Sequence, residues 1–134
     1  MYDKVLVGLS EEGDPGPLLE LATRAVAQGG RVGLLTVIAV RAEDSHSHRI
    51  EAARKRLEGF AAPLRSSGLE VHLATQVTVG QAGAELARRY EESDAELLII
   101  GLGSRSRVGK ALLGSDAQAV LLMTAKPVLC QRLL

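Results

Sequence analysis

The sequence predicts one α/β domain built on a parallel sheet. Five short runs rich in Leu and β-branched residues alternate with four segments that carry apolar residues at helical spacing. This alternation is typical of βαβ units, in which the strands run parallel and helices cover both faces of the sheet. The 134 residues show no linker, repeat or shift in composition, so a single domain over residues 1–134 is expected.

The expected strands are short and differ in their apolar pattern. They are Lys4–Leu9, Val32–Val40, Val71–Val77, Ala95–Ile100 and Pro127–Cys130. The runs that begin at Lys4 and Ala95 are almost continuously apolar, as in strands covered on both faces. The run at Val71 alternates between apolar and polar residues, which favours an edge strand.

Four helices are expected between these strands. They are Pro15–Ala27, Glu43–Ser66, Gln81–Glu92 and Ser115–Thr124. Gly29-Gly30 and Ser67-Gly68 are expected to end the first two, as glycines do at helix C-termini. In the last helix the expected buried stripe is Ala119, Leu122 and Met123.

Composition excludes several classes of function. Sixteen cationic and sixteen acidic residues give a net charge of zero, which argues against a nucleic-acid partner. Cys130 is the single cysteine, so no internal disulfide forms and a cytoplasmic location is expected. The N-terminus lacks the pattern of a signal peptide, and no run reaches about 18 apolar residues, so no membrane partner is expected.

The segment IIGLGSRSRVGKALLGS, residues 99–115, carries four glycines, three cations and no acid. A Walker A loop fails, because Ser104 stands at its first glycine and Ala111 at its Ser/Thr position. A dinucleotide fingerprint that starts at Gly101 fails at its third glycine, which is Ser106 here. The arrangement left is a split loop, in which Gly101 follows a strand and Gly114-Ser115 opens a helix.

This split loop resembles the nucleotide motif of the universal stress protein family, G-x2-G-x9-G-[ST], which is followed by a helix and a strand that begins Pro-Val. Gly101 and Gly114-Ser115 stand at the matching distance, and Pro127-Val128 opens the last strand. The resemblance covers the chain from Lys4 to Cys130 and implies a Rossmann-like three-layer sandwich of the adenine nucleotide alpha hydrolase-like type, with strand order 3-2-1-4-5.

The resemblance also implies a ligand, ATP or a related nucleotide with or without Mg²⁺, bound where strands 1 and 4 end. The adenine side is then expected at Leu9, Ser10 and Val37. Ribose and phosphates are expected at Gly101, Gly103, Ser104, Arg105, Gly114, Ser115 and Asp116. Glycines let the backbone approach phosphate closely, and a helix N-terminus offers unpaired N–H groups.

The sequence departs from the family pattern at three points. Ser104 replaces the second glycine, Ser10 stands where an Asp is common, and Asp116 puts an anion beside the expected phosphates. Ser115 and Gln118 also fit a capping box, which needs no ligand. Two interpretations therefore stay open, a module that binds ATP as a regulatory ligand and an ATP-independent dimeric interaction module.

No catalytic constellation is present, since neither G-x-S-x-G nor an evident general base occurs, and slow ATP hydrolysis is the most that is expected. His46 and His48 lie in a solvated segment and no metal site is expected.

The last strand is expected to form an apolar sheet edge, which invites pairing. Together with the resemblance, this predicts a C2 homodimer through Val128, Leu129 and Cys130.

Overall fold

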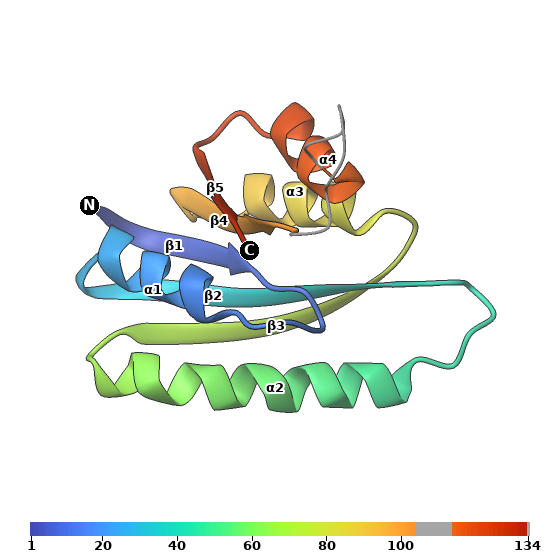
Figure 1. Ribbon diagram of the computed structural model, residues 1–134, viewed down its shortest axis with the longest axis horizontal. Coiled ribbons are helices and arrows are strands. Elements are labelled where there is room, and N and C mark those ends of the chain that lie inside the picture. Colours follow the sequence, from blue (N-terminus) through green and yellow to red (C-terminus); the bar gives the residue numbers. More distant parts are fainter. Residues whose placement is uncertain (104–113, 134) are drawn as a thin grey trace.

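The computed structural model, which describes residues 1–103 and 114–133, contains a parallel sheet of five strands with helices on both faces (Figure 1). The strands are β1 (Tyr2–Gly8), β2 (Val26–Val40), β3 (Glu70–Val79), β4 (Leu97–Leu102) and β5 (Val128–Arg132). The helices are α1 (Gly16–Ala25), α2 (Ser47–Ser66), α3 (Ala82–Glu92) and α4 (Ser115–Met123). No helix within the described ranges is both long and apolar enough to cross a membrane.

The strand order is β3-β2-β1-β4-β5, with every pair parallel, which confirms the predicted topology. The chain leaves β1 toward one edge, through β2 and β3, and then returns to the other side of β1 to form β4. The order therefore reverses between β1 and β4. Parallel sheets bind their ligands beyond the carboxyl ends of the strands at such a reversal.

Alternate side chains of the central strands pack against different helices. Val7 and Ile99 are fully buried in the core cluster that contains α1 and α2 residues such as Leu57. Leu98 and Ile100 point to the other face and join Tyr90 of α3 and Val120 of α4. A strand with apolar residues on both faces reads as a continuous apolar run, which explains the pattern at Lys4 and Ala95.

The start of β2 differs from the prediction. β2 begins at Val26 rather than Val32, and α1 ends at Ala25, so Gly29-Gly30 lies inside the strand and does not end the helix. The register with β1 is irregular here, since Tyr2 pairs with Val26 but Lys4 pairs with Arg31. Gly29 has a φ of +74°, and a Cβ on Gly30 would lie 2.8 Å from the Asp3 carbonyl oxygen. The glycines thus serve a bulge beside β1.

The end of α2 agrees with the prediction. Gly68 has a φ of +92°, and its N–H donates to Arg65 O at 3.0 Å while Leu69 N–H donates to Leu64 O at 3.3 Å. This pair of bonds is a Schellman motif, which satisfies the last carbonyls of the helix. The start differs, because α2 begins at Ser47 rather than Glu43.

Helix α4 corrects two expectations. It buries Ala117 and Val120, whereas Leu122 is 84% exposed and Met123 is 52% exposed. The helix is apolar almost all round, so periodicity alone could not select its buried face. Gly114, not Ser115, occupies the N-cap, and Gln118 N–H donates to the Gly114 carbonyl, so the capping box with Ser115 as its cap is wrong.

The last strand closes the sheet beside β4 and is tied to α3. The buried Tyr90 hydroxyl donates to Pro127 O at 2.6 Å, and Leu98 N–H donates to the same oxygen. The Lys126 ammonium lies 4.4 Å from the centre of the Tyr90 ring. Cys130 is half-buried rather than buried, and partial burial raises the pKa of its thiol.

We expect Tyr90→Phe to lower the free energy of unfolding by about 1 kcal/mol near pH 8, because the Pro127 carbonyl loses a buried donor. Burial raises the pKa of Tyr90 to about 12 in the folded protein, above its ordinary value of 10.0. The neutral phenol therefore stabilises the fold fully below pH 10, and this contribution is lost as the pH rises toward 12.

Urea denaturation at pH 8 and at pH 11 measures this difference. The difference in the free energy of unfolding between the parent protein and Tyr90→Phe should be smaller at pH 11 than at pH 8. Tyr2→Phe is the control, because Tyr2 is a tyrosine that is only half-buried. An unchanged gap at the two pH values would contradict the role assigned to the Tyr90 hydroxyl.

Candidate functional site

A pocket of about 400 Å³ opens at the carboxyl ends of β1, β2 and β4, where the strand order reverses. Six of the residues proposed from the sequence line it. They are Leu9, Ser10, Val37, Gly101, Gly103 and Asp116. Gly114 and Ser115 adjoin this lining at the start of α4, while Ser104 and Arg105 lie outside the described residues.

The two ends of the pocket differ in character. Leu9, Val37 and Ala39 form an apolar end beside β2, and Leu9 is fixed there because its N–H donates to Leu35 O at 2.9 Å. Gly103 and Asp116 lie at the other end, next to the first turn of α4. An apolar end suits a base, and a glycine beside a helix N-terminus suits a phosphate.

The site contains an ion pair that the sequence did not indicate. Arg49 of α2 donates through Nε to Glu11 Oε2 at 3.1 Å and through Nη2 to Glu11 Oε1 at 2.6 Å. The hydrogen bonds that Arg49 donates to Glu11 raise the pKa of Arg49 above its ordinary value. These residues are 38 positions apart, so only the packing of α2 beside the β1–α1 connection brings them together.

A second arginine of α2 holds the same connection. Arg56 Nη1 donates to Ser10 O at 2.8 Å, and its Nη2 donates to Gly13 O. The guanidinium also lies 4.9 Å from the centre of the Phe60 ring. Ser10 is exposed, and its position at the mouth of the pocket is therefore set by a contact to its backbone rather than to its side chain.

The first turns of α3 and α4 are in direct contact. Asp116 Oδ1 accepts a hydrogen bond from Gly83 N at 2.8 Å, and Ser115 O accepts one from Gln81 Nε2 at 2.9 Å. A Cβ on Gly83 would lie 2.4 Å from Asp116 O and 2.6 Å from Asp116 Cα. Only glycine fits this crossing, and the Asp116 carboxylate caps the N-terminus of α3 while it lines the pocket.

The residues suit an adenine nucleotide better than they suit a metal ion. No described atom lies within 4 Å of a Cβ built on Gly103 or Gly114, so both positions leave room for a ligand beside the backbone. The first N–H groups of α4 have no acceptor within the helix. No group of three His, Cys, Asp or Glu side chains placed to hold a metal occurs in residues 1–103 and 114–133.

Comparison with known proteins identifies close sequence relatives. The sequence model of the Universal stress protein family matches residues 1–132. A universal stress protein from Mycolicibacterium smegmatis is 40% identical over 95 residues, which make up 71% of this chain and 72% of that protein.

Solved structures share the fold along the whole chain. Hypothetical protein MJ0577 superposes with a TM-score of 0.79 at 21% identity, over 100% of this chain and 98% of that chain. A universal stress protein from Archaeoglobus fulgidus in complex with dAMP gives a TM-score of 0.67 at 21% identity, over 96% and 97% of the two chains. A universal stress protein in complex with cAMP (TM-score 0.61, 20% identity) and an Arabidopsis thaliana family member with AMP bound (TM-score 0.63, 14% identity) also match.

We expect Gly83→Ala to lower the free energy of unfolding by about 1–3 kcal/mol, because the new methyl group must push the backbone of α4 away from α3. Gly59→Ala is the matched control, since Gly59 lies in α2 and a Cβ there has no atom within 4 Å. That control should be neutral or stabilise the protein by up to about 1 kcal/mol. Equal stability of the two variants in urea denaturation would overturn the close contact of α3 and α4.

Proposed function

Because this chain belongs to the universal stress protein family, we propose that it binds an adenine nucleotide, ATP or a related one, as a regulatory ligand. The observation that carries the proposal is the pocket of about 400 Å³ between the ends of β1 and β4, with the start of α4 at one side. Nucleotide binding then acts as a signal that changes the conformation or partner choice of a stress-response module.

The solved relatives with dAMP, cAMP and AMP support this class of ligand, since each carries one adenine ring and one phosphate. The pocket offers matching features here. Its apolar end fits the ring, and the start of α4 beside Gly103 fits a phosphate.

Two carboxylates in the pocket bear on how many phosphates it accepts. Glu11 is neutralised by Arg49, and Asp116 already accepts the Gly83 N–H. Asp116 still carries a negative charge near the proposed phosphate, and an added negative charge at this end is unfavourable. ATP binding is therefore expected to gain more from Mg²⁺ than AMP binding does.

A second candidate function is an ATP-independent dimeric module that acts through protein contacts. Its support is an exposed apolar surface on α4 and β5, formed by Leu121, Leu122, Met123 and Leu129. Exposed apolar side chains of this kind can mark a protein-contact surface where they adjoin one another. A homodimer through β5, at Val128, Leu129 and Cys130, is compatible with either function, and the lone cysteine fits a cytoplasmic location.

The nucleotide proposal predicts one of two results. Either the purified protein releases an adenine nucleotide into the supernatant when it is denatured, or calorimetric titration shows saturable binding of AMP, cAMP or ATP, measured with and without Mg²⁺. Gly114→Val should weaken this binding at least about tenfold, because its side chain blocks backbone approach to the phosphate. Gly114 has a φ of −69°, which a side chain tolerates, and no atom of the described residues lies within 4 Å of a Cβ built there, so the variant should fold.

Gly59→Val controls for a β-branched residue at an open glycine and should bind as the parent protein does. No nucleotide in the supernatant and no heat up to millimolar ATP or AMP would reject nucleotide binding and leave the dimeric module.

The dimer proposal predicts a mass of two chains in light scattering at micromolar concentration. Leu129→Arg should shift the mass to one chain, because it places a charge on the exposed side of β5. Val79→Arg is the control, since Val79 is 67% exposed on the opposite edge strand. A monomeric parent protein would contradict the dimer.

A further inference from the structure

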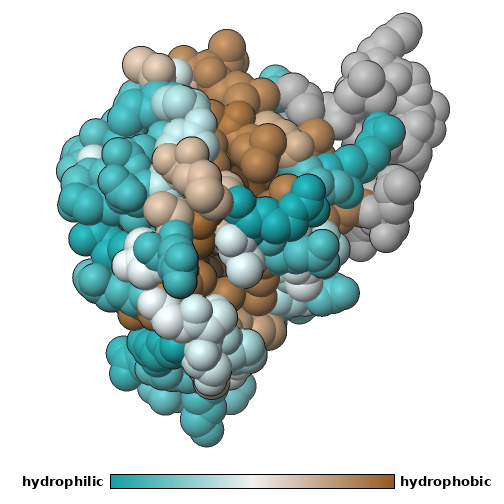
Figure 2. All heavy atoms as spheres, turned by 90° about the vertical axis from the view of Figure 1, so that its left-hand side faces the viewer, coloured by the Kyte–Doolittle hydropathy of each residue, from teal (hydrophilic) through white to brown (hydrophobic). Residues whose placement is uncertain are grey.

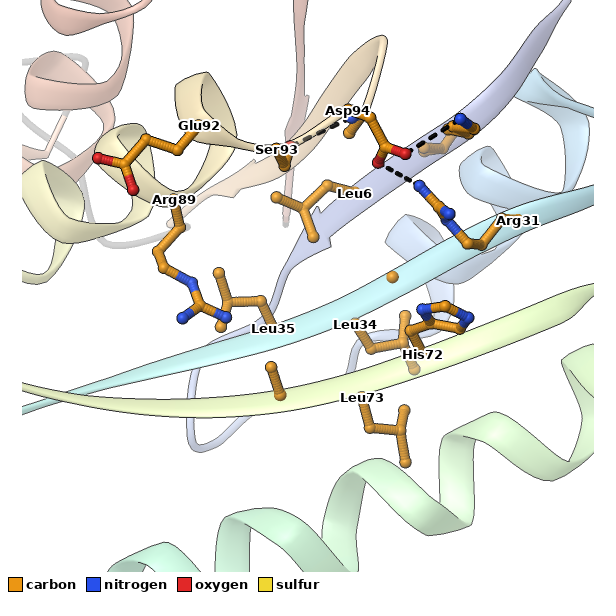
Figure 3. A pocket seen from close by; sticks show the side chains of 15 residues that line it. Leu6, Arg31, Leu34, Leu35, His72, Leu73, Arg89, Glu92, Ser93 and Asp94 are labelled. Atoms are coloured by element: carbon orange, nitrogen blue, oxygen red, sulfur yellow. Dashed lines mark hydrogen bonds and ion pairs between the residues drawn. The ribbon is translucent and has the colours of Figure 1, made fainter.

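A second hollow, of about 460 Å³, lies between α3 and the exposed face of β2 and β3 (Figure 3). It begins at the amino ends of the strands, near Lys4 and Arg31, and runs toward Leu35. α2 packs against β3 on the opposite face, whereas α3 packs against β2 on this side and reaches β3 through the Arg89–Gln76 hydrogen bond. We call this space the α3–β3 hollow.

The floor of the α3–β3 hollow is apolar, and small residues in it leave the space above the strands unfilled. Leu6 and Leu35 contribute the large side chains, and Gly33 and Ala74 lie between and beside them. A Cβ on Gly33 would already lie 3.2 Å from Leu6 Cδ1, so a larger residue would fill the space. Figure 2, which views the molecule from the side where the strands begin, shows apolar atoms gathered in a band between hydrophilic margins.

The rim of the hollow has unequal charges at its two ends. At the Arg31 end, the single carboxylate of Asp94 accepts hydrogen bonds from both Lys4, at 3.0 Å, and Arg31. At the other end, the Arg89 guanidinium points from α3 toward Leu35, as Figure 3 shows, and its one described hydrogen bond goes to the neutral Gln76 Oε1 at 3.0 Å.

The carboxylates near Arg89 are already engaged. Glu85 accepts from Arg88 Nε at 3.0 Å and from Arg88 Nη2, and Glu92 accepts from Arg88 Nη1 at 2.8 Å. In Figure 3 the Glu92 carboxylate points away from Arg89 and from the floor. His72, the remaining titratable residue of the lining, contacts Glu70. Arg89 is thus a half-buried cation that forms no ion pair with a carboxylate in the described part of the chain.

We propose that the α3–β3 hollow binds a small amphipathic carboxylate, with its carboxylate group on Arg89 and its hydrocarbon tail on the half-buried Leu6, Gly33 and Ala74. A planar guanidinium pairs with a carboxylate through two parallel hydrogen bonds, which a neutral head group does not match. The apolar floor supplies the affinity for the tail, in proportion to the area removed from water. The volume lies within the range of about 300–1,000 Å³ that is usual for small-molecule sites.

The hollow is distinct from the nucleotide pocket, because the two share only Leu35 in their linings. Arg89 and its bond to Gln76 belong to the α3–β3 hollow alone. Binding there does not require the proposed nucleotide function and is tested without nucleotide.

The experiment titrates the full chain with sodium octanoate, followed by calorimetry and by amide chemical shifts in NMR. Saturable binding with one site is expected, with the largest shifts at Leu35 and Ala74 and smaller ones at Gly103. Octanol, which keeps the tail but lacks the charge, and acetate, which keeps the charge but lacks the tail, should each bind at least about tenfold more weakly.

Two variants test the charge of Arg89 and the open volume of the hollow separately. Arg89→Gln keeps a donor toward Gln76 but loses the cation, and should weaken octanoate binding about tenfold or more. Arg54→Gln is the control, since Arg54 lies on α2, outside the lining of the hollow, and its ion-pair partner is Glu51 of the same helix. Ala74→Leu keeps every charge but fills the hollow and should weaken octanoate binding as well.

Several results would overturn the proposal. They are the absence of saturable octanoate binding by the parent protein, equal affinities of Arg89→Gln and Arg54→Gln, and octanol binding as tight as that of octanoate. Shifts confined to the nucleotide pocket or to the exposed residues of α4 would also overturn it, because they would place the ligand elsewhere.

Discussion

The geometry of the proposed nucleotide pocket, at the ends of β1, β2 and β4, depends on the crossing of α3 and α4 at Gly83. The Asp116 backbone lies so close to Gly83 that no side chain fits between the helices, and the Asp116 carboxylate and the Gly83 N–H close the contact. The start of α4 is therefore held against the start of α3. This contact lets the helix N-terminus stay beside β4, although residues 104–113 are not among the described ones.

The opposite wall of the pocket is held from α2. Arg49 and Arg56 bind Glu11, Ser10 and Gly13 through charged or backbone contacts, so the β1–α1 connection is fixed at three points. Where the family commonly has an Asp, the exposed Ser10 contributes no charge, and the nearest carboxylate along the chain, Glu11, is paired with Arg49. In the wall beside the apolar end, the charged groups of Glu11 and Arg49 are therefore already paired with each other.

The sequence predicted the strands and helices of the sheet well, because apolar runs and helical periodicity reflect burial directly, while the strand order was implied by the family resemblance. β4 is buried on both faces and reads as a continuous apolar run, and the buried residues of α2, which are Ala53, Leu57, Ala61 and Leu64, recur at helical spacing. The sequence failed where a local pattern has two physical causes. Gly29-Gly30 resembles a helix end, but the pair forms a bulge that fits against Asp3.

The site was only partly predictable for a related reason. Gly101 stands at the matching distance in a glycine motif, and Leu9 and Val37 were implied by the family resemblance that this motif supports. The Glu11–Arg49 pair and the Gly83–Asp116 contact join residues 38 and 33 positions apart, and no local pattern marks either one. Distant contacts of this kind become visible only when the helices are packed.

Helix α3 links the two hollows on its face of the sheet. Its first turn, with Ala82, Gly83 and Leu86, lines the nucleotide pocket, and its last turn supplies Arg89 to the α3–β3 hollow. A Cβ on Gly8 would lie 2.8 Å from Leu86 Cδ2, so Gly8 lets the Leu86 side chain of α3 pack directly on β1. Because Tyr90 also anchors this helix to Pro127, α3 is fixed at both ends. The volumes of the two hollows are therefore set by the same rigid element.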